Sequence, residues 1–299
     1  MTASTATAAA PTRLRARQLV ADYFFLTKPK VQSLLLLTTV TTMEVAGSPS
    51  LSRIAVTCLG GYLSAGGAGA VNHYWDRDID AKMKRTANRP IPSGRVSPAA
   101  ALSFGLALAA LSFVLMTATV GLLAASLALG GFAGYVGVYT MWLKRRTPHN
   151  IVIGGAAGAM PPLVGWAAAR GSLSWTAIYL FAIVFYWTPP HFWALSLLMK
   201  DEYAEVGIPM LPVVRGEHET RRQILLYSLL LYAVTQLPFC AGAFGGVYLV
   251  SSMTLGVAFL AGAVMLYRRA DRRAALRLYL FSMLYLALLF GAMVADVKF

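Results

Sequence analysis

Nine long apolar runs dominate this sequence and restrict the folds open to it. Most approach the roughly 20 residues that a helix needs to cross a bilayer. We place them at residues 30–46, 54–74, 98–117, 119–142, 150–168, 174–198, 222–243, 246–267 and 275–295. Of the 299 residues, 58% are hydrophobic and only 13% are charged. A soluble domain of this size has no need for runs of that length, so the sequence predicts an all-α polytopic membrane protein, a bundle of nine transmembrane helices.

The positively charged residues follow the predicted loops in an alternating pattern. Of the 26 Lys and Arg residues, 23 lie in the N-terminal segment and in the loops after the second, fourth, sixth and eighth runs. By the positive-inside rule, this distribution predicts a cytoplasmic N-terminus and a C-terminus on the opposite side. The net charge of +14 therefore reflects membrane topology and does not indicate nucleic-acid binding.

The first residues carry arginines but no apolar core of signal-peptide length. We expect residues 1–24 to form a flexible cytoplasmic N-terminal tail and residues 25–299 to form a single transmembrane domain. The simplest location for such a multi-pass chain in a lipid bilayer is a bacterial cell (inner) membrane, with the site facing the cytoplasm.

A row of oxygen-bearing side chains stands where the second run ends. If this stretch is helical, Asn72, Asp76 and Asp80 fall four residues apart and stack on one helix face. Hard cations such as Mg²⁺ prefer oxygen ligands and often bridge carboxylates to the phosphates of a substrate. By itself the row is equally compatible with a solvated helix end, so its surroundings must decide between a binding site and an ordinary surface.

A second acidic pair follows the sixth run. Asp201 and Glu205 are again four residues apart at a predicted cytoplasmic helix end, and eight of the 12 acids lie in the two loops that carry the row and this pair. Basic residues accompany the row. Acidic side chains can bind a metal cation and neighbouring basic side chains can bind an anion, so the combination suits a metal-bound phosphate ester. With an apolar interior open to lipid, the two loops predict a site for an isoprenyl diphosphate at the cytoplasmic mouth.

A secondary transporter is the alternative from another class, because paired prolines at 161–162 and 189–190 interrupt two of the runs. Transporters place their coupling charges near the midplane of the bilayer. Here the acids cluster at one interface, so we rank transport below an enzyme.

Several motifs extend this interpretation beyond the acidic row. The chain resembles the UbiA-type intramembrane prenyltransferases, and within them the branch that farnesylates haem. The row indicates the wider family, whereas the stretch from 188 to 212 indicates the haem branch. The similarity covers essentially all of residues 25–295, and its motifs include 72–80 (NHYWDRDID), 88–92 (NRPIP), 143–145 (LKR), 150–155 (NIVIGG), 190–195 (PHFWAL) and 208–212 (IPMLP).

The resemblance implies a reaction. It is the Mg²⁺-dependent transfer of the farnesyl group of farnesyl diphosphate to a vinyl group of haem b (protohaem IX), with addition of water, giving haem O and diphosphate. Haem A synthase is the downstream partner that it suggests. The alternative within the same fold is a prenyltransferase that acts on a quinone-precursor aromatic ring or another acceptor.

The resemblance also implies site residues. Mg²⁺ binding and catalysis are expected from Asn72, Asp76, Asp80 and Asp201. Glu205 joins them as a metal ligand, although the superfamily has aspartate at its place. The expected diphosphate contacts are Lys84, Arg85, Arg89, Lys144 and Tyr139.

Haem recognition is expected within the sixth run. His191, flanked by Pro190 and Phe192, is the best of four histidines for lining a porphyrin pocket, together with Trp193. A lone histidine in a membrane span is more often hydrogen-bonded structure than an iron ligand, and this is the favoured interpretation for each of the four.

Overall fold

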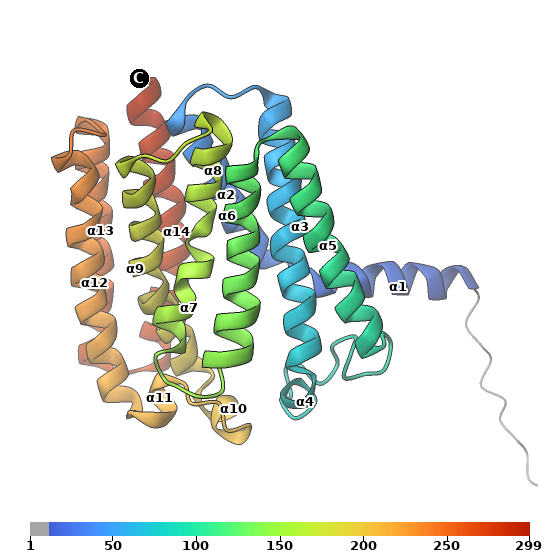
Figure 1. Cartoon of the computed structure of the whole chain (residues 1–299). Helices are drawn as coiled ribbons and strands as arrows, with labels where there is room; N and C mark the ends of the chain where they lie inside the picture. The colour runs from blue at the N-terminus through green and yellow to red at the C-terminus, as the bar shows by residue number, and fades with distance from the viewer. Residues whose placement is uncertain (1–11) are drawn as a thin grey trace, which may run out of the picture.

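The computed structural model describes residues 12–299, and within that range the chain is helical with no strand. An N-terminal helix projects sideways from a bundle of long helices, as Figure 1 shows. The helices are α1 (Thr12–Leu26), α2 (Pro29–Ala46), α3 (Leu51–Trp75), α4 (Arg77–Asp80), α5 (Pro98–Thr119), α6 (Leu122–Ala133), the π-helix η1 (Gly134–Leu143), α7 (Asn150–Gly158), α8 (Met160–Arg170), α9 (Trp175–Leu198), α10 (Lys200–Glu205), α11 (Leu211–Val214), α12 (Gly216–Cys240), α13 (Gly246–Arg269) and α14 (Arg272–Lys298).

Seven helical stretches of the described chain are long and apolar enough to cross a membrane. They are α3, α5, α6 with η1, α7 with α8, α12, α13 and α14. The other two predicted spans are also helical: α2 packs against α8, and α9 packs against α12 and α14. The structure therefore confirms a multi-pass, all-α membrane protein, while nine crossings and the orientation of the termini stay predictions.

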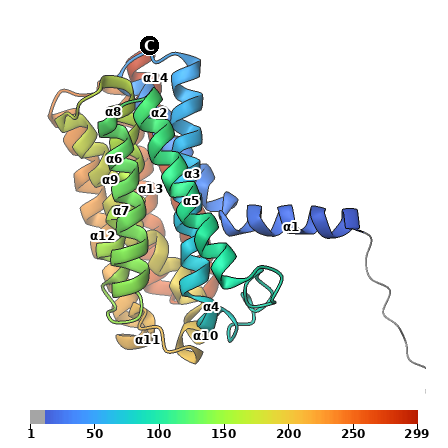
Figure 2. The same cartoon turned by 45° about the vertical axis from the view of Figure 1, so that its right-hand side comes forward.

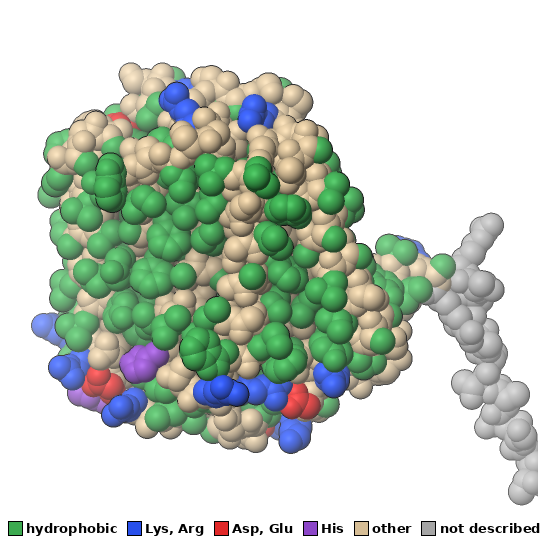
Figure 3. Space-filling view, in the orientation of Figure 1, with side chains coloured by type: hydrophobic (Ala, Val, Ile, Leu, Met, Phe, Trp, Pro, Cys, Tyr) green, Lys and Arg blue, Asp and Glu red, His purple; other side chains and the backbone are tan. Residues whose placement is uncertain are grey.

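The two ends of the bundle differ in character. The short helices α4, α10 and α11 gather at one end, and the C-terminus lies at the other (Figures 1 and 2). A wide hydrophobic surface separates them, and Lys and Arg side chains gather mainly at the end with the short helices (Figure 3). The site described below lies at that basic end.

Local sequence signals set several helix boundaries. Four helices begin with an N-cap side chain that accepts a hydrogen bond from a backbone N–H in the first turn; these caps are Ser50, Ser97, Ser174 and Asp271. The fifth predicted span breaks at Ala159, and α8 then starts with prolines in its first turn, where an N–H has no helical partner to lose. The interruption of this run by the prolines at 161–162 is present as this break.

The helix that carries the acidic row packs closely against its neighbour. At Gly67 of α3, an added Cβ would lie 2.5 Å from the carbonyl oxygen of Gly105 on α5. A Cβ added at Gly105 would lie 2.8 Å from the carbonyl oxygen of Gly67. Two backbones approach this closely only where side chains are absent. The glycines of the second run therefore position α3, and with it the residues that follow Gly67 toward the basic end.

The described part of the predicted N-terminal tail is helix α1, so it is helical from Thr12 onward. Asp22 of α1 is buried, and the Nε atom of Arg95 lies 3.1 and 3.0 Å from its two carboxylate oxygens. This contact attaches α1 to the loop that precedes α5. Residues 1–11 lie outside the described range, and the division into tail and transmembrane domain stays a prediction.

Candidate functional site

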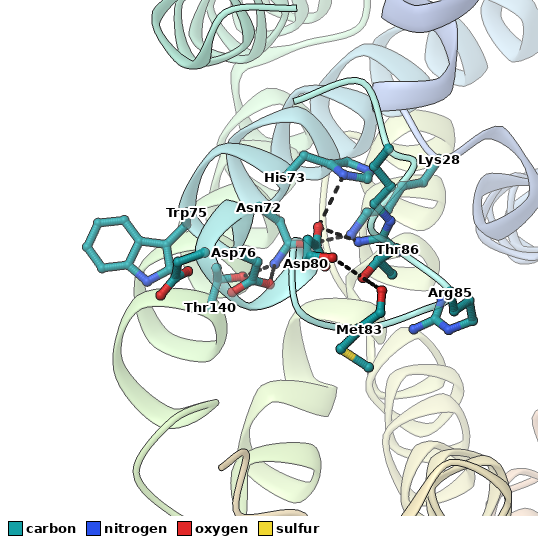
Figure 4. Close-up of polar contacts among 12 residues, drawn as sticks. Lys28, Asn72, His73, Trp75, Asp76, Asp80, Met83, Arg85, Thr86 and Thr140 are labelled. Carbon is teal, nitrogen blue, oxygen red and sulfur yellow. Dashed lines mark hydrogen bonds and ion pairs between the residues drawn. The ribbon is translucent and has the colours of Figure 1, made fainter. Parts of the chain in front are cut away.

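The predicted acidic row lies on one continuous helical path. Asp76 separates α3 from α4, yet its N–H donates to the carbonyl of Asn72 at 2.9 Å, and the N–H of Asp80 donates to the carbonyl of Asp76 at 2.8 Å. Asn72, Asp76 and Asp80 are 4%, 1% and 4% exposed. Figure 4 shows the three side chains close to one another at the end of the bundle. Buried carboxylates require charged partners, so the row is not a solvated helix end.

Basic side chains neutralise the two buried carboxylates. Lys144 Nζ donates a hydrogen bond to Asp76, whose second oxygen lies 3.6 Å from Arg145 Nη2. Arg89 Nη1 donates to Asp80 at 2.7 Å. Arg89 and Lys144 were both predicted as diphosphate contacts, and the structure brings both to the row.

Lys28, immediately before α2, completes the basic surroundings. Its ammonium donates to Asn72 Oδ1 at 2.5 Å and to the Tyr135 hydroxyl at 3.2 Å. In the sequence, Lys28 precedes the first apolar run and is indistinguishable from an interfacial anchor, so the charge pattern did not reveal its place in the site. The sequence did not reveal the role of Tyr135 either, because this residue lies within an apolar run.

A π-helix brings the third wall of the site into register. Within η1, hydrogen bonds reach five residues back, as from the N–H of Lys144 to the carbonyl of Tyr139 at 2.8 Å. In an α-helix with 3.6 residues per turn, Tyr135 and Lys144 would lie about two and a half turns apart, on opposite faces. The wider π turn makes their separation about two whole turns, so both face the acidic row. Thr140 of the same segment accepts from Asn72 Nδ2 at 3.1 Å.

These walls enclose a cavity of about 120 Å³, which we call the charged cup. Its floor is the acidic row, its rim includes Arg85, and the loop around α10 contributes Tyr203 and Ile208. The full lining is Lys28, Asn72, Asp76, Ile79, Asp80, Met83, Arg85, Arg89, Tyr135, Tyr139, Lys144, Tyr203 and Ile208.

A salt bridge outside the cup strengthens its outer wall. Arg145 donates to both carboxylate oxygens of Asp78 at 2.7 and 2.8 Å, which lowers the pKa of Asp78 and raises the pKa of Arg145. Burial raises the pKa of Tyr203, so its phenol stays protonated. The cup therefore presents fixed cations and neutral hydroxyls to a ligand.

The donor set suits Mg²⁺. Asp76 Oδ1 is buried and accepts no hydrogen bond from the described residues, which leaves this carboxylate oxygen available to a metal ion. No cluster of three His, Cys, Asp or Glu side chains in residues 12–299 forms a metal cage. Mg²⁺ commonly takes one or two carboxylates and completes its shell with waters and substrate phosphates. Asn72, Asp76 and Asp80 fit that requirement.

The structure does not bring the second acidic pair to the cup. Asp201 and Glu205 are exposed, and Asp201 lines another cavity, of about 200 Å³, with Lys200, Glu217 and Arg221. The helical path breaks at Met199, and Tyr203 of α10 points into the cup, so Asp201, two residues earlier, faces away. The acidic row and the pair of Asp201 and Glu205 therefore do not face each other in this structure.

The structure places the remaining expected residues in different surroundings. Lys84 is exposed and does not line the cup, whereas Arg85 lines it and lies 3.8 Å from Glu202. His191 and Trp193 are both buried in α9 but do not share a face, because they are two residues apart in a helix. His191 Nδ1 lies 2.7 Å from Ser282 Oγ, and Trp193 packs edge-on against Tyr227.

An apolar helical bundle with a cup of buried carboxylates and cations at one end defines a class of integral membrane protein with a charged site at the end of its bundle. The sequence places the chain within that class. It belongs to the UbiA prenyltransferase family, whose sequence model matches residues 34–289.

Curated relatives match nearly the whole chain. The protoheme IX farnesyltransferase of Chloroflexus aurantiacus is 54% identical over 295 residues, covering 98% of this chain and 50% of the relative. That of Symbiobacterium thermophilum is 53% identical over 289 residues, covering 95% of this chain and 97% of the relative. The chain spans about half the length of several of these relatives, the Chloroflexus and Roseiflexus proteins among them.

Solved structures share the fold at low sequence identity. A digeranylgeranylglyceryl phosphate synthase matches with a TM-score of 0.77 at 16% identity, covering 94% of this chain and 99% of that chain. A UbiA homologue from Archaeoglobus fulgidus, solved with DMAPP and Mg²⁺, matches with a TM-score of 0.65 at 15% identity, covering 91% and 99%. These similarities concern the fold.

Proposed function

We propose that this chain transfers the farnesyl group of farnesyl diphosphate to a vinyl group of haem b, giving haem O and diphosphate. The observation that carries prenyl transfer is the charged cup, where buried carboxylates and cations meet at the end of an apolar bundle. The haem acceptor rests on the relatives above 50% identity, which are named for this substrate.

The cup binds the diphosphate through fixed charges. Lys28, Arg85, Arg89 and Lys144 supply donors to its oxygens, and Tyr139 lies beside them. Asn72, Asp76 and Asp80 would hold Mg²⁺, which supplies charge neutralisation at the diphosphate when bound. In the structure Lys28, Arg89 and Lys144 already contact the row, so diphosphate binding exchanges these contacts for contacts with phosphate oxygens.

The chemistry follows from the charge that develops on the leaving group. The bond between C1 of the farnesyl group and the diphosphate oxygen breaks, and the cup stabilises the negative charge that the diphosphate gains. C1 bonds to the terminal carbon of the vinyl group, the adjacent carbon takes the positive charge, and water adds there with loss of a proton. The tyrosine rings at 135, 139 and 203 are positioned to stabilise an allylic cation through their π faces.

The membrane arrangement that we propose has nine crossings, with α2 and α9 completing the seven apolar helices. The basic loops place the N-terminus and the cup on the cytoplasmic side of a bacterial inner membrane, and the C-terminus on the other. Asp201 as a metal ligand and haem A synthase as recipient of the product stay predictions from the resemblance.

The direct test offers the purified full chain farnesyl diphosphate and Mg²⁺ with either haem b or 4-hydroxybenzoate, and detects products by mass. We expect a farnesylated haem only, lost on chelation of Mg²⁺ and restored when the ion is returned. Prenylated 4-hydroxybenzoate without farnesylated haem would refute the acceptor. Unchanged activity of Asp76→Asn would refute the role of the cup.

A further inference from the structure

A second cavity lies at the basic end of the bundle, where α9, α10, α12, α13 and α14 meet. Its volume is about 200 Å³, and it shares no lining residue with the charged cup. One water needs only about 10–15 Å³, so the space is large enough for a molecular group. We call it the mixed-charge pocket, because leucines and alanines line it together with six charged side chains, Lys200, Arg221, Arg272, Asp201, Glu217 and Asp271.

Two of the three carboxylates of the pocket already have partners within the protein. Asp271 is the N-cap of α14, and its side chain accepts a backbone N–H at 2.6 Å. Glu217 accepts from Lys200 at 3.1 Å and from Arg221 Nη1 at 3.4 Å. Asp201 is exposed, and its side chain forms no hydrogen bond or salt bridge within residues 12–299. The carboxylate of Asp201 is therefore free to bind a cation.

Two arginines of the pocket are incompletely paired. The side chain of Arg221 is only 13% exposed, and its one hydrogen bond in the described chain is the 3.4 Å contact with Glu217. Its Nε is fully buried without a partner, whereas Nη2 forms no hydrogen bond and is not fully buried. Arg272 is exposed and pairs with no carboxylate in the same range. Guanidinium groups present a planar fork of donors that matches phosphate oxygens, so both arginines suit a phosphate.

The pocket lies at the depth of the lipid headgroups. Leu266 of α13 forms part of its lining, and the next residue, Tyr267, is 37% exposed. Exposed tyrosines on membrane helices are typical of the level at which headgroups meet acyl chains. Figure 3 shows basic and acidic side chains directly below the hydrophobic surface at this end of the bundle. A ligand at this depth is expected to have both a polar and an apolar part.

An exposed apolar ridge continues from the pocket along α14. Leucines follow Arg272 at intervals of four residues, and such residues form a continuous ridge on a helix surface. Each of these leucines is between 45% and 53% exposed. The ridge extends about 18 Å, which is more than half of the roughly 30 Å hydrocarbon thickness of a bilayer. It is therefore long enough to contact an acyl chain through one leaflet, and it consists of Leu276, Leu280, Leu284 and Leu288.

We propose that the mixed-charge pocket binds the headgroup of an aminophospholipid, in which a primary ammonium follows the phosphate. Arg221 and Arg272 bind the phosphate oxygens, Asp201 binds the ammonium, and the leucine ridge contacts an acyl chain. A headgroup with a phosphate but no ammonium would place its negative charge beside the unpaired carboxylate of Asp201. The pocket is separate from the charged cup, so this inference goes beyond the proposed reaction and does not depend on it.

The test measures which lipids the full chain retains in detergent, by native mass spectrometry. Phosphatidylethanolamine, phosphatidylglycerol and phosphatidylcholine with identical acyl chains are added in equal amounts. We expect one phosphatidylethanolamine to be retained about tenfold or more tightly than either other lipid, because glycerol carries no cation and choline has no N–H for Asp201. Equal retention of phosphatidylethanolamine and either of the other lipids would overturn the inference.

Neighbouring arginines provide matched controls for the pocket. Arg221→Met and Arg272→Gln are each expected to weaken retention of phosphatidylethanolamine about tenfold, because each removes a charged donor to the phosphate. Arg222→Met and Arg273→Gln change exposed side chains outside the lining and leave retention unchanged. Circular dichroism checks the fold of Arg221→Met, and Arg272→Gln tests the site without changing a buried side chain. Unchanged retention in both pocket variants would overturn the inference.

The same headgroup without acyl chains distinguishes a membrane lipid from a soluble phosphate ester. Glycerophosphoethanolamine is expected not to displace the bound lipid at equal concentration, since it makes no contact with the leucine ridge. Displacement at equal concentration would show that the pocket takes a soluble ester and would overturn the lipid assignment. None of these measurements uses farnesyl diphosphate or haem, so failure of the proposed reaction and failure of this inference are distinguishable.

Discussion

The buried pair of Asp76 and Lys144 permits a quantitative test of the charged cup. Their side chains are 2% and 14% exposed. Removing one partner leaves the other charge nearly buried, and breaking a buried ion pair in this way costs about 3–5 kcal/mol. Because Lys144 keeps some solvent contact and Arg145 lies 3.6 Å from Asp76, we expect the low end, about 3 kcal/mol, for Asp76→Asn and for Lys144→Met.

The double variant Asp76→Asn/Lys144→Met separates stability from function. Replacing both members of a buried pair by uncharged side chains is often near neutral, so we expect its free energy of unfolding to lie within about 1 kcal/mol of the parent. Catalysis does not recover, because the amide at position 76 no longer offers a charged ligand for Mg²⁺. Asp76→Asn and the double variant therefore both lack activity, although the double variant regains stability.

The assay is unfolding in mixed detergent micelles, followed by far-UV circular dichroism, with product formation measured on the same preparations. Lys84→Met is the matched control, because Lys84 is exposed and lies outside the cup. Independent changes add within about 0.5 kcal/mol. If the decreases in the free energy of unfolding of the two single variants sum to the decrease in the double variant within about 0.5 kcal/mol, the pair is not coupled and our description of the cup is wrong.

Three further predictions follow from other contacts. Gly67→Val is expected to lower the free energy of unfolding by about 1–3 kcal/mol or more, because its Cβ would meet the backbone of α5. Gly61→Ala is expected to change it little in the same detergent assay, because the added Cβ would lie 4.0 Å from Leu36 Cδ2, an ordinary van der Waals contact. Lys28→Met and Arg89→Met are each expected to raise the KM for farnesyl diphosphate at least tenfold, and an unchanged KM in both would contradict the assigned contacts. A third test places spin labels on cysteines introduced at the exposed positions 82 and 204, in a chain with Cys58 and Cys240 replaced by alanine. The labels are expected to approach each other when Mg²⁺ and farnesyl diphosphate are added, because Asp201 must turn toward the cup to bind metal. An unchanged distance between the labels would argue against Asp201 as a ligand.

Hydropathy and helical spacing anticipated much of this fold because both depend on local sequence. The apolar runs became helices with boundaries close to those expected, and Asn72, Asp76 and Asp80 kept their spacing because the chain stays helical through residue 80. Arg89 and Lys144 reached the row as the motifs implied.

The parts that the sequence did not anticipate depend on geometry that local patterns do not contain. An assumed α-helical period places Tyr135 and Lys144 on opposite faces, and nothing in the sequence announced the π-helix that aligns them. The break at Met199 turned Asp201 away from the cup, although its spacing to Glu205 matched that of the first row. Lys28 meets Asn72 across 44 positions of sequence, a long-range contact beyond any periodicity argument.

The charged cup has a consequence for turnover. In the proposed reaction the cup holds the diphosphate of farnesyl diphosphate, and the diphosphate leaves with all its oxygens. The cup therefore binds the diphosphate product through the same contacts. Such a site favours product release as the slow step. The floor at Asp76 and Asp80 is closed, while the side chain of Arg85 at the rim is 49% exposed. Diphosphate therefore departs past this arginine, and added diphosphate should act as a competitive inhibitor of the prenyl donor.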